Sequence, residues 1–340
     1  MARNRTQWTV AVALLAAIAL MTGCRKSAAH PSETREVMGT KVTIVVYDAG
    51  VTLRDMKPVF TDVFNLLGDF ERKSLLPGTL NQVAGLSSGA GNQSVPLDAE
   101  IFDMLMKALR FYDQSDKVFD VRYGPLLDLW RFENKPRVPS KTELDSALTL
   151  VAAGGIFVAG NSILLAKRGM RFDAREIALG YALDLAAAKL SERGVRSAMI
   201  YSPRVCRTMG DPPERRGFPF ALANPLQSDT PWANVWVPVG GTAYASAATD
   251  RFTAGGKSYH SLLDPRTGMP AEKCAGALVQ ARDAVTAQAM AYSVFVWGTA
   301  DSLAAEGKTA VSGTVIVRDR NGKFDVSTSG SLADRIEVSK

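Results

Sequence analysis

Residues 260–270 read His-Ser-Leu-Leu-Asp-Pro-Arg-Thr-Gly-Met-Pro, and they are the most informative stretch of the chain. The run Asp-Pro-Arg-Thr-Gly begins at Asp264, and it follows a Gly-Lys-x-Tyr-His approach over residues 256–260. This combination is rare, so it is a specific marker of evolutionary relationship. It also contains two groups that could act as a base, the carboxylate of Asp264 and the imidazole of His260.

The composition is that of an ordinary globular protein. The chain has 340 residues, of which 46% are hydrophobic and 22% charged. This length suits one large domain or two closely packed lobes with a sizeable core. The formal net charge of +6 is a mild excess. Since the sequence has no block of lysine and arginine and no interleaved aromatic and basic patch, we expect no nucleic-acid partner.

The N-terminus has the pattern of an export signal. Arg3 and Arg5 precede an apolar run from Trp8 to Met21, and Thr-Gly-Cys follows, ending at Cys24. A charged segment, an apolar segment and small residues before a cysteine are typical of bacterial lipoprotein signals. The alternatives are a plain cleaved signal and an uncleaved anchor, but the run is shorter than the ~20 apolar residues that a spanning helix prefers.

This interpretation divides the chain into a signal peptide (1–23), a polar tether (24–35) and one folded domain (36–340). It predicts that Cys24 is acylated and that its acyl chains hold the protein to a lipid membrane. The expected location is the bacterial cell envelope, on the periplasmic or outer face.

The order of expected elements predicts an α+β fold with mixed, mostly antiparallel sheets. Apolar residues recur at helical spacing in the helices. Asp283 is a good N-cap and Gly298 a good stop for the last of them. β-branched runs between turn residues indicate the strands. The expected helices cover 52–70, 98–112, 173–194 and 284–297; the expected strands lie at 37–47, around a 158–163 hairpin, at 196–201, 218–223, 234–239, 243–247 and 275–281, and from 311 onward.

The 260–270 stretch resembles the signature H-I-I-D-P-R-T-G of the ApbE-type FAD:protein FMN transferases. The resemblance implies a two-lobed single domain of that fold. It also implies a bacterial, often lipid-anchored enzyme that uses magnesium to move FMN from FAD to a threonine of an exported protein. The histidine expected three residues before Asp264 is Ser261 here, and His260 stands one position away. On a strand, such a shift turns a side chain to the opposite face.

Other stretches extend the resemblance over most of the chain. Residues 38–40 match M-G-T, residues 118–130 resemble G-A-F-D-x-T-x-G-P-L…L-W, and residues 172–184 align without gaps on D-L-G-G-I-A-K-G-Y-A-V-D. Each stretch alone also fits a purely structural turn or loop. Taken together, the matches imply that the flavin nucleotide is contacted by five residues: Met38, Val118, Phe119, Asp120 and Asp173.

The positions that the family uses for metal and phosphate are altered. A small pair has become Arg175-Glu176, although the backbone carbonyl of Glu176 could still contribute to a cation site. In the family helix T-A-D-A-L-A-T, an aspartate and a threonine four residues apart face one cation; here those positions are Gln288 and Tyr292. Magnesium prefers hard oxygens that include a carboxylate, and a tyrosine phenol stays protonated near neutral pH.

Further departures affect neighbouring loops. The family's G-G-D turn is Ser202-Pro203-Arg204 here, and its T-S-G-D-Y segment is residues 246–250, Ser-Ala-Ala-Thr-Asp. Apart from Cys24, the cysteines are Cys206 and Cys274. A disulfide between them and two separate thiols are both open, because the sequence carries no geometry.

Three interpretations of function therefore remain. The favoured one is a lipoprotein of the FAD:protein FMN transferase family whose activity is weak or lost because metal and phosphate positions are substituted. The alternatives are an active flavin transferase with a variant metal site and a non-enzymatic scaffold or ligand-binding lipoprotein. FAD is the expected substrate, and an exported flavoprotein is the expected acceptor. Magnesium is the cofactor that the resemblance implies, although its side-chain ligand positions are substituted here. In the active case Asp264 or His260 would be the base.

Overall fold

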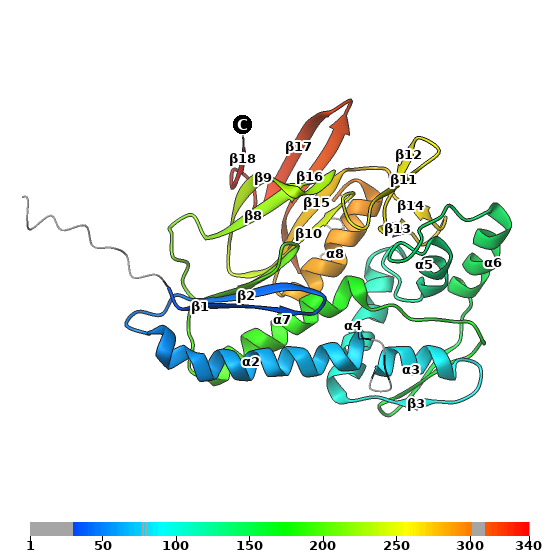
Figure 1. Cartoon of the computed structure of the whole chain (residues 1–340), viewed down its shortest axis with the longest axis horizontal. Helices are drawn as coiled ribbons and strands as arrows, with labels where there is room; N and C mark the ends of the chain where they lie inside the picture. The colour runs from blue at the N-terminus through cyan, green and yellow to red at the C-terminus, as the bar shows by residue number, and fades with distance from the viewer. Residues whose placement is uncertain (1–29, 77, 79–80, 301–309, 340) are drawn as a thin grey trace, which may run out of the picture.

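The computed structural model describes residues 30–76, 78, 81–300 and 310–339. Its mixture of helices and mostly antiparallel sheets confirms the α+β prediction (Figure 1). The predicted signal peptide and Cys24 lie outside the described residues, so their interpretation stays a prediction.

Within the described part of the chain, no helix combines the length and the apolar character needed to cross a membrane.

Local capping satisfies free backbone groups at the ends of several helices. Asp283 accepts a hydrogen bond from the Thr286 N–H at 3.0 Å and so caps the last helix, and Gly298 ends it with φ 71°. The first turn of the helix Leu53–Ser74 is stabilised by a reciprocal capping box between Thr52 and Asp55. The helices are α2 (Leu53–Ser74), α3 (Gln82–Gly89), α4 (Ala99–Gln114), α5 (Gly124–Trp130), α6 (Lys141–Val151), α7 (Arg175–Glu192) and α8 (Ala284–Trp297).

Among the described residues the largest sheet has eight strands, and each strand pairs antiparallel with its neighbours. Its order is β1 (Ser32–Val37), β2 (Thr40–Val46), β6 (Ala198–Tyr201), β7 (Val205–Met209), β10 (Gly240–Ser246), β15 (Gly276–Ala281), β16 (Val311–Arg320) and β17 (Lys323–Gly330). Smaller sheets are formed by β18 (Ile336–Val338), β9 (Gln227–Val237) and β8 (Phe218–Asn224); by β3 (Val95–Pro96), β5 (Ser162–Leu165) and β4 (Ile156–Ala159); by β11 (Phe252–Ala254) with β12 (Lys257–Tyr259); and by β13 (Leu263–Asp264) with β14 (Met269–Pro270).

The large sheet has a core on each face. Helices α2, α7 and α8 pack on one face, where alternate residues of β2 such as Ile44 are buried. The three-stranded sheet β18-β9-β8 covers part of the other face and encloses a second core around Phe218 and Leu278. A third cluster, under α5 and α6, surrounds Trp130, whose indole N–H donates to the carbonyl oxygen of Gly268 at 2.8 Å. That bond ties the turn after Asp264 to α5.

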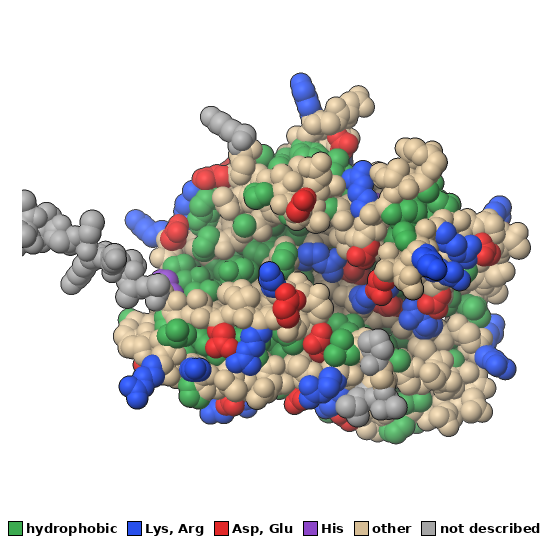
Figure 2. Space-filling view, in the orientation of Figure 1, with side chains coloured by type: hydrophobic (Ala, Val, Ile, Leu, Met, Phe, Trp, Pro, Cys, Tyr) green, Lys and Arg blue, Asp and Glu red, His purple; other side chains and the backbone are tan. Residues whose placement is uncertain are grey.

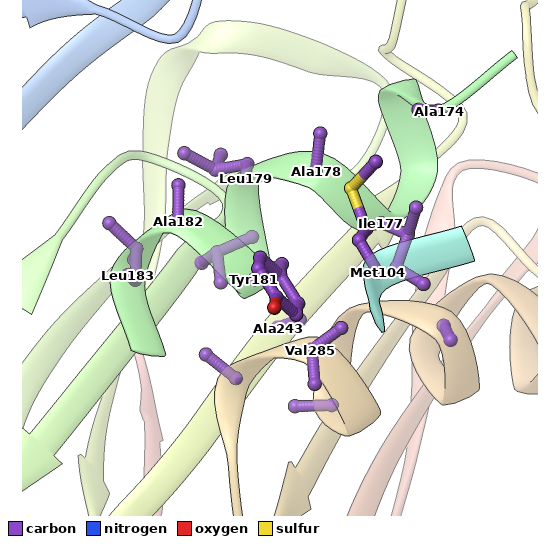
Figure 3. Packing of buried hydrophobic residues seen from close by; sticks show 14 of the residues in the cluster. Met104, Ala174, Ile177, Ala178, Leu179, Tyr181, Ala182, Leu183, Ala243 and Val285 are labelled. Carbon is purple, nitrogen blue, oxygen red and sulfur yellow. The ribbon is translucent and has the colours of Figure 1, made fainter. Parts of the chain in front are cut away.

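Helices α7 and α8 lie in close contact (Figure 3). Ile177 and Ala178 of α7 belong to the same buried cluster as Val285 of α8 and Met104 of α4. At Gly180 the approach is so close that a Cβ atom would overlap the carbonyl oxygen of Ala284. A glycine at this position therefore lets the backbones of the two helices meet.

Two expected boundaries were wrong. The strand expected over 37–47 is the second half of a hairpin, because Met38 and Gly39 both have positive φ (59° and 67°) and turn the chain. Its first half, β1, begins at Ser32, so residues 32–35 belong to the sheet although they were assigned to the tether.

Candidate functional site

A cleft lies between the helical layer and the large sheet. Its main cavity, of about 710 Å³, is lined by the β1–β2 turn, the end of α2, the start of α7, the β6–β7 turn and the segment after β10. A second cavity, of about 620 Å³, adjoins it and shares with it four lining residues, Leu75, Leu127, Glu133 and Arg175. Acidic and basic side chains gather around a hollow near the middle of the face that Figure 2 shows.

Met38 lines the main cavity from the β1–β2 turn. Its side chain is buried, and the following N–H, of Gly39, donates to Glu71 Oε1 at 2.8 Å. The turn is thereby held to the last turns of α2. This placement brings Met38 and the start of α7 to the same cavity.

Asp120 is buried, and its carboxylate is neutralised by the arginine two residues later. Arg122 donates to Asp120 Oδ1 through its backbone N–H (2.9 Å) and Nε (2.8 Å), and to Oδ2 through Nη2 (2.8 Å). Burial raises the pKa of Asp120, while Arg122 opposes that shift. Val118 and Phe119 are buried next to it, and the Phe119 ring meets the Tyr292 ring edge-on.

Asp173 is held in the same way and lines the second cavity. Its Oδ1 accepts the backbone N–H and the Nε of Arg175, both at 3.1 Å. Arg175 Nη1 also donates to Glu133. Since Glu133 and Arg175 line both cavities, this ion pair stands where the two cavities adjoin.

Asp264 completes the series. Arg266 donates to Asp264 Oδ1 through its backbone N–H (3.0 Å) and Nε (2.9 Å), and to Oδ2 through Nη2 (2.7 Å). Asp264 is not among the residues that line either cavity. The aspartates at 120, 173 and 264 are thus each clamped by an arginine at position i+2. This repeated Asp-x-Arg pattern was visible in the sequence, and it is the signal that the sequence analysis missed.

Gln288 is buried in α8 and forms hydrogen bonds with the first two turns of α7. Its Oε1 accepts the Gly180 N–H at 2.6 Å, and its Nε2 donates to the carbonyl oxygen of Arg175 at 3.0 Å. In a regular helix the Gly180 N–H would donate to the carbonyl of Glu176. The amide of Gln288 therefore lies against the backbone segment from which a Glu176 carbonyl ligand was expected.

Tyr292 lies one turn farther along α8 and is also occupied. Its hydroxyl donates to the carbonyl oxygen of Leu263, in the strand that carries Asp264. The ring is fully buried and meets Phe119 and Tyr123 edge-on. Burial raises the pKa of Tyr292 well above its ordinary value, so the phenol stays protonated.

His260 is buried beside the ring of Phe295. Its Nε2 lies 3.0 Å from the carbonyl oxygen of Ala271, so this nitrogen carries the hydrogen. Burial lowers the pKa of His260 to about 4. Its neighbour Ser261, and not His260, lines the main cavity, and Ser261 Oγ donates to Asp250 Oδ2 at 2.8 Å.

Arg204 lines the main cavity from the β6–β7 turn. Ser202 is buried and shapes this turn, because its Oγ accepts the N–H groups of Arg204 (3.3 Å) and Val205 (3.0 Å). The Arg204 guanidinium lies 3.6 Å from Glu176 Oε1 and 3.5 Å from Thr249 Oγ1. Both contacts are long for charge-assisted pairs.

The residues at the expected metal position do not fit a magnesium ion. Both functional atoms of the Gln288 amide and the Tyr292 hydroxyl are bonded within the protein, and neither residue supplies a carboxylate. Across the residues that the structure describes, no group of three or more His, Cys, Asp and Glu side chains is placed to hold a metal ion.

Cys206 and Cys274 are two separate buried thiols in the structure, which answers the question that the sequence left open. Cys206 lies in β7, and the Cys274 thiol donates to the carbonyl oxygen of Phe295 at 3.3 Å. Burial raises the pKa of each thiol to about 12, so neither is a ready nucleophile.

Comparison with protein families matches residues 38–312 to a family model described as the ApbE family. Among curated proteins, a FAD:protein FMN transferase of Vibrio cholerae is 23% identical over 330 residues, which cover 95% of this chain and 97% of the relative. A protein of the same name from Treponema pallidum is 25% identical over 335 residues, covering 93% and 91%.

Solved structures share the fold. The ApbE protein of Thermotoga maritima superposes with a TM-score of 0.74 at 24% identity, over 88% of this chain and 97% of that one. The flavin transferase ApbE of Vibrio cholerae gives a TM-score of 0.75 at 18% identity, over 89% and 98%. These values confirm the expected architecture.

Proposed function

The chain belongs to the ApbE family, and from this premise we propose that it is a family lipoprotein that binds FAD in the cleft and transfers FMN weakly or not at all. Its relatives carry the name FAD:protein FMN transferase over nearly the whole chain. A flavoprotein acceptor and a lipid anchor at Cys24 are parts of the same proposal, and they rest on the family and on the N-terminal pattern.

The cleft supports flavin binding. Its main cavity lies within the roughly 300–1,000 Å³ that is typical of ligand pockets. Apolar side chains such as Met38, Tyr123 and Leu179 line it together with a few polar groups, among them Arg204 and Ser246. Such a mixture can hold an aromatic ring system and orient a phosphorylated tail.

One observation carries the proposal that transfer is weak or absent. Gln288 and Tyr292, at the two side-chain positions of the family's metal helix, bond to Gly180, Arg175 and Leu263 instead of facing free space. A cation at this place would have to break those buried hydrogen bonds, and each group left unpaired costs about 1–3 kcal/mol. The protein therefore favours its own internal contacts over a magnesium ion.

Two measurements on the purified full chain without its signal peptide test the proposal. We expect the fluorescence of FAD to be quenched and shifted when FAD binds the protein. We also expect no magnesium-dependent release of AMP when an exported flavoprotein acceptor is added. Turnover comparable with that of an active family member would contradict the weak-transfer part. A colourless protein that leaves FAD fluorescence unchanged would contradict flavin binding and favour the scaffold interpretation.

A double variant tests the assignment of the metal helix. Gln288→Asp with Tyr292→Thr restores a carboxylate and a hydroxyl on one face of α8, four residues apart. We expect this variant to bind magnesium more tightly than the wild type in calorimetry. The matched control is Gln288→Asn with Tyr292→Phe, which changes both side chains without adding a carboxylate. Equal magnesium affinity in the wild type and both variants would contradict the assignment.

A further inference from the structure

We propose that Arg204 supplies, in place of a divalent cation, the positive charge that binds the phosphate groups of a nucleotide in the cleft, and that Glu176 is its competing counter-ion. Binding at this site is therefore independent of metal. The inference rests on the proposed flavin binding and adds to it the group that recognises the phosphates.

The first support is the contrast between Arg204 and the neighbouring arginines. Arg122, Arg175 and Arg266 each donate to an aspartate at i−2, so their charges are already matched. Arg204 has instead an ion pair at 3.6 Å and a hydroxyl contact at 3.5 Å. A phosphate oxygen could approach it at the shorter distance, about 2.7–2.9 Å, that is typical of charge-assisted hydrogen bonds.

The second support is the way the backbone holds Arg204 in place. Ser202 Oγ accepts two N–H groups of the turn, and the carbonyl oxygen of Arg204 accepts the Tyr244 N–H at 2.7 Å. The side chain thus starts from a backbone that is fixed to β10, and about a third of it is exposed (31%). A guanidinium on a fixed backbone loses less freedom when it binds a phosphate, which favours affinity.

The third support is the position of Glu176 in the first turn of α7. Its side chain is mostly buried, lines the same cavity and draws the guanidinium toward the helix. An anion that binds Arg204 must compete with this carboxylate and is repelled by it. Glu176 should therefore weaken the binding of phosphates, and its removal should strengthen it. This opposite effect of two adjacent residues is specific to the proposed arrangement.

The experiment measures the binding of FAD and riboflavin by fluorescence titration in EDTA and again with magnesium. We expect FAD to bind the wild type with the same affinity, within about twofold, in both buffers. Arg204→Gln should weaken FAD binding at least tenfold and leave riboflavin binding unchanged, because riboflavin carries no phosphate. Arg204→Lys should restore part of the loss, and Glu176→Gln should tighten FAD binding severalfold. Arg216→Gln is the matched control, since Arg216 stacks on Trp236 and pairs with Glu337, and it is not among the lining residues of the cavity.

The outcomes separate the two proposals. If FAD binds the wild type in neither buffer, both the proposed flavin binding and this inference are overturned. FAD binding that needs magnesium, or that Arg204→Gln leaves unchanged, overturns the role of Arg204 alone. An equal loss of FAD and riboflavin binding in a folded Arg204→Gln variant also overturns it. If the circular dichroism melting curve shows instead that this variant is unfolded, Glu176→Gln decides. Tighter FAD binding to Glu176→Gln then supports the counter-ion role, and unchanged binding contradicts it.

Discussion

The N–H of Gly180 donates to the side-chain oxygen of Gln288 at 2.6 Å, so a buried hydrogen bond joins two helices that are far apart in the sequence. The Nε2 group of the same amide donates to the carbonyl oxygen of Arg175, so Gln288 both accepts and donates a hydrogen bond to α7. The Gln288 side chain therefore stabilises the contact between α7 and α8.

Gln288→Ala is expected to lower the free energy of unfolding by about 2 kcal/mol or more, because it removes a buried side chain together with its hydrogen bonds to the Gly180 N–H and the Arg175 carbonyl. Urea unfolding followed by circular dichroism measures the change. Gln93→Ala is the control, since Gln93 is exposed and should change stability by less than about 0.5 kcal/mol. Equal stability of the Gln288 variant and the wild type would show that the amide contributes nothing.

Gly180→Ala is expected to destabilise the protein by about 1–3 kcal/mol, because the added methyl group overlaps the Ala284 carbonyl and pushes α7 and α8 apart. Gly68→Ala in α2 is a matched control. Its Cβ would meet nothing closer than Arg72 Nη1 at 3.7 Å, so the better helix propensity of alanine should stabilise the protein by up to about 1 kcal/mol. The two midpoints of unfolding in urea should therefore move in opposite directions, and a shared direction would contradict the close-packing argument.

Tyr292→Phe removes the hydroxyl that donates to the Leu263 carbonyl, and we expect a loss of about 1–2 kcal/mol. Tyr244→Phe is the control, at a residue of β10 that lines the main cavity. The Tyr244 hydroxyl is buried and has no hydrogen-bond partner among the described residues, so its removal should be neutral or slightly stabilising. Thermal unfolding of both variants measures the difference, and a larger loss in the Tyr244 variant would refute the assignment of these two hydroxyls.

His260 should make stability depend on pH. Burial lowers its pKa to about 4 from an ordinary value of 6.5, so the unfolded chain binds a proton between these values more readily than the folded one. The neutral His260 side chain therefore contributes about 3 kcal/mol to the free energy of unfolding. This contribution is fully present above pH 6.5 and is lost as the pH falls toward 4. The free energies of unfolding of the wild type and His260→Gln, compared at pH 7 and pH 5, should therefore approach each other as the pH falls. A constant difference would mean that His260 does not titrate in this way.

Structural features that depend on residues close together in the sequence were mostly predicted correctly. The limits of α8 followed from Asp283 and Gly298, because a cap and a positive-φ stop act within one helical turn. The β1–β2 hairpin was missed although its turn is local, since Met38 is a non-glycine residue in a left-handed conformation. The Asp-x-Arg clamps were also within reach, because each joins residues only two apart.

The sequence by itself determined the family, the α+β class and the substitutions at Gln288 and Tyr292, because motifs and helical spacing are properties of short stretches. Only the tertiary structure decided what those substitutions do. The partners of Gln288 lie 108 and 113 residues away, and the partner of Tyr292 lies 29 residues away. Whether a polar side chain is free to hold a ligand depends on which backbone groups the packing of helices and sheets brings within about 3 Å of it, and that distance is set by the whole fold.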